Sequence, residues 1–466
     1  MPPSRLKSAA PARGAARTAK TAATELVPAA TDTPAKTSAP AAATGTRATT
    51  SAPARSTAAR SQLPSCELSQ ARARWHARQG LAAPAAGPVA AVIAATGWPR
   101  TLGGIDVYLA TQARTAGLRR ADLDTAVASG ELQVVPAVRG CIYLVPRAEA
   151  ALCLRIAEEK WRPRTERELI KAGTTWGEID EVAAAARAAL TAGPLTSDGL
   201  RRALPPGTCR SFGEAGKKVG LSSPLPLALR VLEFAGQIER TLPGGRLDTE
   251  RYEWRLVAPR AQPAQVPATA PERFARLAAL FFSVAAPATI KDFAGWAGLS
   301  GREAQAAVAA LPLIPMRVPG YAEEALGYAE DLQPAPPSHA VSFLSFDDNY
   351  LTLHGGPAVL TEPVQHGRAL PAWGAPGSST LGEARHATLR TVLIGPRIVG
   401  FWEYDPDARH VVYATFDKSD QEPALVTAAE SLTTLLRDEL KHGRSFSLDT
   451  DDELRTRRHL VQQVSP

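Results

Sequence analysis

Cysteine, methionine and aromatic residues are scarce in this chain of 466 residues, which has 4 cysteines, 2 methionines and an aromatic content of 6%. The cysteines contain no C-x-x-C pair and no spacing typical of disulfide frameworks or zinc ligands, so we interpret them as reduced thiols. The 8 histidines are dispersed and no H-E-x-x-H motif occurs. We therefore expect neither a metal centre nor a small-molecule cofactor.

Long hydrophobic runs are also missing. The longest, residues 277–290, is interrupted by Pro287 and is shorter than the roughly 20 apolar residues that a membrane helix needs. The N-terminus lacks the uninterrupted apolar segment of a secretory signal. Its Arg-rich, acid-poor composition leaves an organelle transit peptide open as an alternative, but we expect a soluble cytoplasmic protein.

Outside its N-terminal region the chain carries no net charge. The net charge is +7, and the first 60 residues hold nine basic and two acidic residues, which leaves 44 of each sign in the remainder. This region is rich in Ala, Pro, Ser and Thr and has no aromatic residue, so we predict a disordered tail. Its charges could attract phosphate, or the tail could be a solubilising extension. Any affinity of the folded part for an anionic partner must come from a local basic face.

The rest of the chain is long enough for two to four domains. Hydrophobic periodicity predicts helices followed by a two-strand ribbon at 132–145. The same order recurs up to a second ribbon, whose strands 237–240 and 251–256 flank a Pro-Gly-Gly turn, and three more helices are predicted after residue 271. Helices followed by a β-ribbon are typical of winged-helix domains.

From residue 341 the pattern changes to predicted strands at 341–346, 391–394, 398–404 and 410–416 and a helix at 423–440. We therefore expect a mainly α chain with small β wings, that is, an α+β fold of tandem winged-helix modules with a C-terminal α+β cap. The predicted divisions are a disordered basic tail (1–60), three winged helices (61–160, 161–260 and 261–335), the cap (336–450) and a second tail (451–466).

Winged helices bind duplex DNA through a helix in the major groove and a wing on the phosphates, although many of them bind only proteins. In the second module basic residues gather around the third helix and the ribbon, with two lysines upstream. They are Arg230, Arg240, Arg246 and Arg251, and Lys217 and Lys218. Both phosphate binding and an ordinary solvated face fit this pattern.

Four segments carry a resemblance to a known family. Residues 104–108 (GIDVY) and 139–146 (RGCIYLVP) are similar, in order and spacing, to G-L-Q-x-Q or Q-x-D followed by R-G-T-x-H-L-V-P. Residues 287–299 (PATIKDFAGWAGL) resemble GPAT-x-x-DFA-x-W-x-GL, and residues 343–351 (FLSFDDNYL) resemble LLP-x-x-D-x-YL. The chain therefore resembles the AlkZ-like winged-helix DNA glycosylases, whose closing strand pair is similar to residues 391–402.

The resemblance, which covers about residues 68–445, implies tandem winged helices around a concave DNA cleft and hydrolysis of the N-glycosidic bonds of alkylated or crosslinked nucleotides. In the family two polar side chains one residue apart act on water and on the sugar, and here these positions are Asp106 and Tyr108. Asp106 could orient or deprotonate water, while Tyr108 could donate a hydrogen bond or stack on a base. Further DNA contacts are expected from Arg139, Tyr143 and Asp348.

Departures from the family pattern leave other interpretations open. An amide pair, or an amide and a carboxylate, is usual at Asp106 and Tyr108, and Thr and His are usual at Cys141 and Tyr143. Asp106 and Tyr108 also fit a surface acid and a half-buried aromatic of a lapsed site, and Asp348 fits a turn residue at a strand end. The expected partner is damaged duplex DNA, bound by a monomer at the nucleoid with no membrane involved. The alternatives are a non-catalytic regulator or nucleoid-associated protein, and a winged-helix protein–protein scaffold.

Overall fold

The computed structural model describes residues 62–101, 103–249, 251–258, 265–371, 378–446 and 449–464. The predicted tail, residues 1–60, lies outside these ranges, as does part of the Pro/Ala linker between the second and third predicted modules. Among the described helices, none combines the length and the apolar character that crossing a bilayer requires.

Four helices and one hairpin form the first unit. They are α2 (Leu68–Arg78), α3 (Val89–Thr96), α4 (Asp106–Gln112), α5 (Arg120–Ala128) and the antiparallel pair β1 (Leu132–Pro136) and β2 (Ile142–Pro146). Helix α5 starts where the carboxylate of Asp122 accepts a hydrogen bond from the backbone N–H of Arg119. The hairpin lies where a ribbon was predicted, but a turn at Val138–Gly140 separates its strands, and Arg139 has a φ of 57° there.

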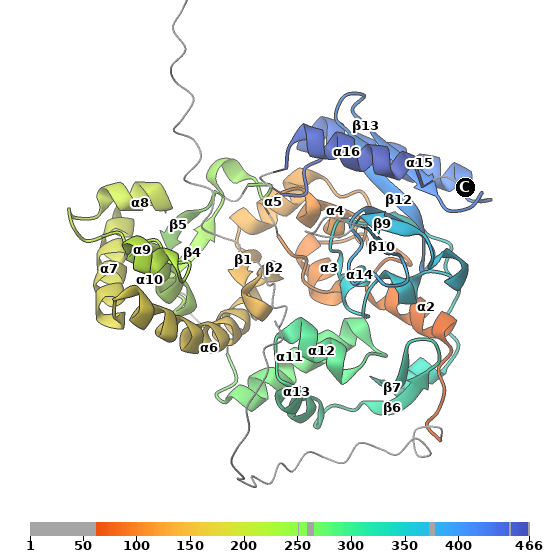
Figure 1. Ribbon diagram of the computed structural model, residues 1–466, viewed down its shortest axis with the longest axis horizontal. Coiled ribbons are helices and arrows are strands. Elements are labelled where there is room, and N and C mark those ends of the chain that lie inside the picture. Colours follow the sequence, from red (N-terminus) through yellow and green to blue (C-terminus); the bar gives the residue numbers. More distant parts are fainter. Residues whose placement is uncertain are drawn as a thin grey trace, which may run out of the picture.

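A helix of 26 residues, α6 (Arg147–Ala172), joins the first unit to the second, and the sequence pattern does not predict it. Its first half buries Ala150 and Ile156 in one hydrophobic cluster, whereas its end buries Leu169 and Ala172 in another. Because the two halves face different cores, no single apolar stripe runs along the helix. Figure 1 shows α6 running from the central β1–β2 hairpin to the lobe that contains α7 and α10.

The second unit combines four helices with a three-stranded sheet. The helices are α7 (Trp176–Ala189), α8 (Ser197–Ala203), α9 (Gly213–Lys217) and α10 (Pro224–Phe234), and the sheet order is β3 (Leu195–Thr196), β5 (Glu253–Leu256), β4 (Ile238–Thr241). The hydroxyls of Thr175 and Thr196 start α7 and α8 by accepting a hydrogen bond from the backbone three residues on. The ribbon predicted on either side of the Pro-Gly-Gly turn is present as β4 and β5.

The third unit repeats the order of helices and hairpin. Its elements are α11 (Ala270–Ala285), α12 (Ile290–Ala297), α13 (Gly301–Val308), β6 (Ile314–Val318) and β7 (Ala322–Gly327). Thr289 with Asp292 forms a reciprocal cap at the start of α12, and Ser300 with Glu303 does the same for α13. The motif at 287–299 therefore contains the residues that start α12 and the residues of α12 that are buried.

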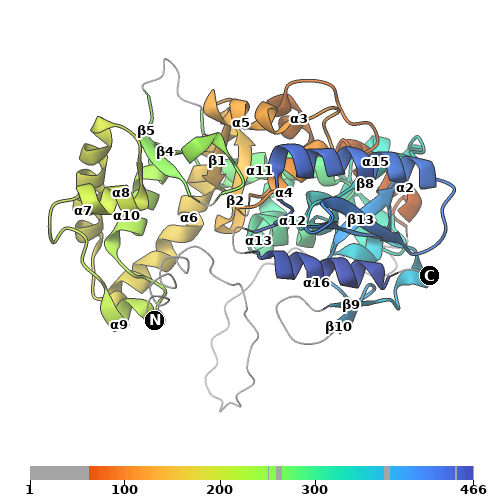
Figure 2. The same ribbon diagram turned by 90° about the horizontal axis from the view of Figure 1, so that it is seen from above.

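The C-terminal part is built on an antiparallel sheet in the order β13 (His410–Thr415), β12 (Arg397–Asp405), β11 (Arg390–Ile394), β8 (Val341–Phe343). Figure 2 shows α15 (Glu422–Thr434) and α16 (Asp451–Gln462) on opposite sides of this sheet. Further short elements of this part include α14 (Asn349–Thr352), β9 (Ala369–Pro371) and β10 (Ser378–Thr380).

Two expectations for this part differ from the structure. The strand predicted at 341–346 ends at Phe343, because the chain turns at Asp347, with a φ of 56°, and Asp348 then caps α14. The second predicted tail, 451–466, contains α16, which starts with a capping box between Thr450 and Glu453 and buries Leu454 and Val461. The charged surface of this helix hides its short apolar face in the sequence.

The predicted α+β class with small antiparallel sheets is confirmed. One large buried cluster joins the first unit, the third unit and the C-terminal part, with members such as Val134, Phe281 and Leu436. The second unit has a cluster of its own, which includes Val182 and Leu229. Three residues of α4, namely Val107, Tyr108 and Leu109, belong to this shared cluster. The division into three winged-helix domains stays a prediction, although each of the three described units has helices followed by a hairpin.

Candidate active site

The segment before α4 is held by a C-terminal stretch of the chain. Gly103 forms an antiparallel bridge with Phe446, and the backbone N–H of Ile105 donates to the carbonyl of Arg444 at 2.9 Å. A Cβ atom on Gly104 would lie 2.3 Å from the backbone oxygen of Ser445. Only glycine permits this close approach of two backbones, which gives a physical reason for the glycine that begins the motif at 104–108.

Asp106, the first residue of α4, is buried, with 3% of its surface exposed. Its Oδ1 lies 3.3 Å from Nη2 of Arg390 and accepts a hydrogen bond from Oγ of Ser445, also at 3.3 Å. Oδ2 is buried and has no hydrogen-bond partner among the described residues. One oxygen of this carboxyl group is therefore fixed by the protein and the other is left for a different partner.

Two guanidinium and three carboxyl groups share this buried region. Arg390 donates to Glu403 at 2.8 Å, while Arg457 donates to Glu403 at 2.6 Å and to Asp449 at 2.9 Å. Burial raises the pKa of Asp106 to about 7; Arg390 and Ser445 oppose this rise, and Glu403 adds to it. Asp106 can therefore gain or lose a proton close to neutral pH.

Asp106 lines a small pocket between the end of α3, one face of α4 and the loop after β8. The pocket volume is about 10 Å³, which is about what one water molecule requires. Because Oδ1 already has partners, Oδ2 is the oxygen of this carboxyl group that has none among the described residues. The polar lining includes Thr96, Arg100, Thr111, Arg114, Asp347 and Asp348.

Two arginine–aspartate pairs hold the pocket wall. Arg114 donates to both carboxylate oxygens of Asp348, at 2.9 Å and 2.7 Å, and both side chains are buried. Arg100 donates to Asp347 at 2.6 Å, and Nδ1 of His386 lies 3.7 Å from its other oxygen. Burial raises the pKa of Asp347, but His386 and Arg100 outweigh this effect and keep that pKa below its usual value. Asp347 is therefore a carboxylate at neutral pH, at the partly exposed side of the pocket.

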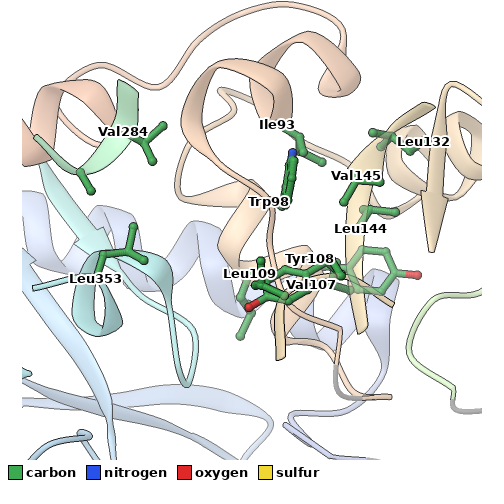
Figure 3. Close-up of a cluster of buried hydrophobic side chains, with 14 of the residues drawn as sticks. Ile93, Trp98, Val107, Tyr108, Leu109, Leu132, Leu144, Val145, Val284 and Leu353 are labelled. Atoms are coloured by element: carbon green, nitrogen blue, oxygen red, sulfur yellow. The ribbon is translucent and has the colours of Figure 1, made fainter. Parts of the chain in front are cut away.

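Tyr108 does not share the surroundings of Asp106. It is fully buried, its hydroxyl donates to Asp124 at 2.5 Å and it accepts from the backbone N–H of Leu247 at 2.9 Å. Residues two apart on a helix point about 200° away from each other, so α4 directs the two side chains to opposite sides. Figure 3 shows Tyr108 inside the hydrophobic cluster, close to Leu144 and Val145. Both polar partners of Tyr108 belong to the protein, and the expected pair of neighbouring catalytic groups is separated.

The residues predicted from the first hairpin also separate. Arg139 is exposed at the turn between β1 and β2, whereas Tyr143 is buried at 1% exposure. Burial raises the pKa of Tyr143, and Arg100 and Arg139 oppose this rise. Asp348, which was predicted to contact DNA, forms the buried pair with Arg114 instead. Of these three positions, only Arg139 presents its side chain to solvent.

The basic residues predicted in the second unit are dispersed. Arg240 is buried, donates to both oxygens of Glu233 and stacks on Tyr252 and Trp254. Arg230 lies 3.9 Å from the same Glu233. The two lysines, Lys217 and Lys218, are exposed at the end of α9, where Lys217 pairs with Glu214.

Arg246 and Arg251 instead lie together in an open groove with Asp248, Lys441 and His442. The groove has a volume of about 520 Å³. Asp248 accepts hydrogen bonds from Arg246 and lies 2.9 Å from Nε2 of His442, while Arg251 and Lys441 are exposed. Basic groups therefore outnumber the single carboxylate described in this groove.

Several groups of the site were not singled out by sequence reasoning, namely Arg100, Arg114, Asp347, Arg390 and Ser445. Asp347 stands next to the predicted Asp348 in the motif at 343–351, so the same motif could have been used to predict Asp347 as a site residue. Within the described ranges, no group of three or more His, Cys, Asp or Glu side chains could hold a metal ion.

The comparisons with known proteins agree with the resemblance seen in the sequence. A family model described as DNA glycosylase AlkZ-like matches residues 104–435. A search of curated proteins found no match. Among solved structures, Streptomyces sahachiroi DNA glycosylase AlkZ is similar at 19% identity and a TM-score of 0.59, over 80% of this chain and 97% of that chain, which shows a shared fold. Because the family model covers more than half of the sequence, the prediction of family is confirmed, and the chain belongs to the AlkZ-like DNA glycosylase family.

Proposed function

We propose that this protein is a DNA repair enzyme that hydrolyses the N-glycosidic bond of alkylated nucleotides in duplex DNA. The observation that carries the proposal is the carboxyl group of Asp106, which lies at the family's motif, has one oxygen fixed by Arg390 and Ser445, and lines a pocket with room for about one water. We further propose that it acts as a monomer on chromosomal DNA at the nucleoid, through units of winged-helix type.

Departure of the base requires little activation by the protein when the base is alkylated. A purine alkylated at N7 carries a positive charge, so the bond between C1′ and the base breaks with its electron pair moving to the base. A water then forms the new bond to C1′ and transfers a proton to the ionised Asp106, which yields the free base and an abasic sugar. Asp347, ionised at the partly exposed side of the pocket, would stabilise the positive charge that develops on the sugar.

Release of base from modified duplex tests this proposal. Purified protein is incubated with duplex DNA that contains 7-methylguanine and, separately, with duplex crosslinked by a nitrogen mustard, and the free base and abasic sites are quantified. The proposal predicts base release from the first substrate; release from the second would extend the activity to crosslinks. Salt-dependent binding with no release from either substrate would contradict it and favour a non-catalytic DNA-binding protein.

We also propose that the groove of Arg246, Arg251, Lys441 and His442 contacts DNA phosphates. The support is its excess of basic groups and the exposure of Arg251 and Lys441. Both side chains can approach phosphate without breaking the contacts of Arg246 and His442 with Asp248.

Replacing Arg251 or Lys441 by alanine should weaken duplex binding and lower the slope of log K against log salt by about 1 for each phosphate that the protein no longer neutralises. Fluorescence anisotropy between roughly 50 and 200 mM salt measures both effects. Arg397→Ala, an exposed arginine on β12, is the control and should leave the slope unchanged. Equal slopes for the wild type and all three variants would remove the groove from the proposed DNA interface.

A further inference from the structure

The stretch Gly443–Phe446 lies after residue 435, where the match to the family model ends, yet it contacts the motif that begins α4. We propose that this stretch, with Ser445 at its centre, is a positioning element that orients the carboxyl group of Asp106 and holds it in its charged form for catalysis. Ser445 is a positioning residue because it acts through Asp106. The inference rests on the proposed function for its consequence in catalysis, but its structural part can be tested without DNA.

The first support is the double role of the Ser445 hydroxyl. It accepts a hydrogen bond from Nη2 of Arg390 at 2.7 Å and donates to Oδ1 of Asp106 at 3.3 Å. The same Nη2 of Arg390 donates to the carbonyl of Gly443 at 2.8 Å. Two residues of the stretch therefore hold the guanidinium group that lies beside Asp106, and one of them also holds Asp106 itself.

The second support is the way in which the stretch is tied to α16. The backbone N–H of Ser445 donates to Asp449 at 3.0 Å, and Asp449 in turn accepts from Arg457 of α16 at 2.9 Å. Arg457 also donates to Glu403, the other carboxylate that holds Arg390. A closed set of hydrogen bonds thus connects α16, Ser445, Arg390 and Asp106, so the position of Ser445 is determined by folded structure rather than by a free chain end.

The consequence for Asp106 follows from its geometry. A carboxyl group rotates easily about its last bond, so an unrestrained Asp106 would share its two oxygens between Arg390 and the pocket. With Oδ1 held from two directions, Oδ2 is the oxygen that remains for a water in the pocket. A hydrogen bond to the charged form also favours ionisation, which a general base needs.

The test replaces Ser445 by alanine and follows the titration of the Asp106 carboxyl carbon by NMR in the full-length protein without DNA. The midpoint for Ser445→Ala should lie above that of the wild type, because the variant lacks a hydrogen bond to the charged form. In parallel, the rate of base release near pH 6 should fall by at least about threefold and approach the wild-type rate near pH 9, since a base with a higher pKa is ionised only at higher pH.

Thr450→Ala is the matched control on the same part of the chain. Thr450 caps α16 through Glu453 and does not contact Asp106, so its loss should lower the melting temperature and leave the titration midpoint and the shape of the pH–rate curve unchanged. An unchanged midpoint in folded Ser445→Ala would overturn the inference. If the wild type releases no base, the proposed function fails, while the NMR midpoints still decide whether Ser445 controls the charge of Asp106.

Discussion

Replacing Asp106 by asparagine should lower the rate of base release by about 10²- to 10⁴-fold, the usual contribution of a positioned general base. Asparagine has the shape of aspartic acid and keeps an oxygen for Ser445 and Arg390, so the fold should survive. What it loses is the capacity to take a proton from water at the position of Oδ2. Single-turnover release of 7-methylguanine, with enzyme in excess, measures this directly.

A folding measurement accompanies this variant. Burial raises the pKa of Asp106 to about 7, whereas an aspartate in the unfolded chain has its ordinary value of about 4, so the wild type loses stability as the pH rises from about 4 to about 7. The stability advantage of Asp106→Asn over the wild type should therefore grow between about pH 4 and pH 7 and stay constant above pH 7, where the carboxyl group is ionised in both the folded and the unfolded wild type. Asp122→Asn, at the more exposed start of α5, is the activity control. Base release by Asp106→Asn within about threefold of the wild type would exclude this carboxyl group as the base.

Replacing Arg390 by methionine should reduce the free energy of unfolding by about 3–5 kcal/mol, the usual cost of removing one partner from a buried ion pair. Arg390 is 2% exposed and donates to Glu403, Gly443 and Ser445, and it also stacks on Trp402. Methionine fills part of the space but leaves Asp106 without a guanidinium partner and Glu403 with Arg457 alone. The loss should be larger at pH 8 than at pH 5, where Asp106 is protonated. Urea unfolding at the two pH values measures it.

The matched control for this variant is Arg397→Met. Arg397 lies on the neighbouring strand β12, is about half exposed at 51%, and forms a single long contact of 3.4 Å with Glu362. An exposed pair of this kind contributes about 1 kcal/mol or less. Similar losses for Arg390→Met and Arg397→Met would mean that the buried network does not hold the C-terminal part to α4.

The elements that could be predicted from the sequence are those with local signals. Thr289 and Asp292 fix a helix start through contacts three residues apart, and the Pro-Gly-Gly segment marks the loop between β4 and β5. Helix α6 lacks such a signal because its buried face changes partner halfway along. Helix α16 has a local start signal in Thr450 and Glu453, but its surface is mostly charged and its apolar face is short, so the segment was taken for a tail.

The candidate site could be predicted only where a motif marked it. Asp106 was found through the motif at 104–108, but Arg390 and Ser445 are separated from it by 284 and 339 residues, and nothing local relates them. The grouping of Tyr108 with Asp106 came from the family motif, whereas in α4 two side chains two positions apart point to different sides.

For Arg240, the sequence contained a pattern that argues against contact with phosphate. Arg240 stands two residues after the buried Ile238 on β4, and residues two apart on a strand share a face. The alternation of this strand therefore indicates that Arg240 points inward, toward Glu233, rather than toward phosphate. No pattern in the sequence indicates that Arg251 and Lys441 lie in one groove, because the two segments that form it are about 190 residues apart in the sequence.

The dependence of base release on pH tests most directly whether the buried carboxyl group beside Ser445 activates the water. For the wild type on 7-methylguanine duplex, the logarithm of the single-turnover rate should rise by about one for each pH unit and level off above about pH 7. In Asp106→Asn this rise of the rate with pH should be absent. A rate that is flat from pH 5 to pH 8, or an Asp106 carboxyl group that titrates near the ordinary aspartate value of about 4, would contradict the account.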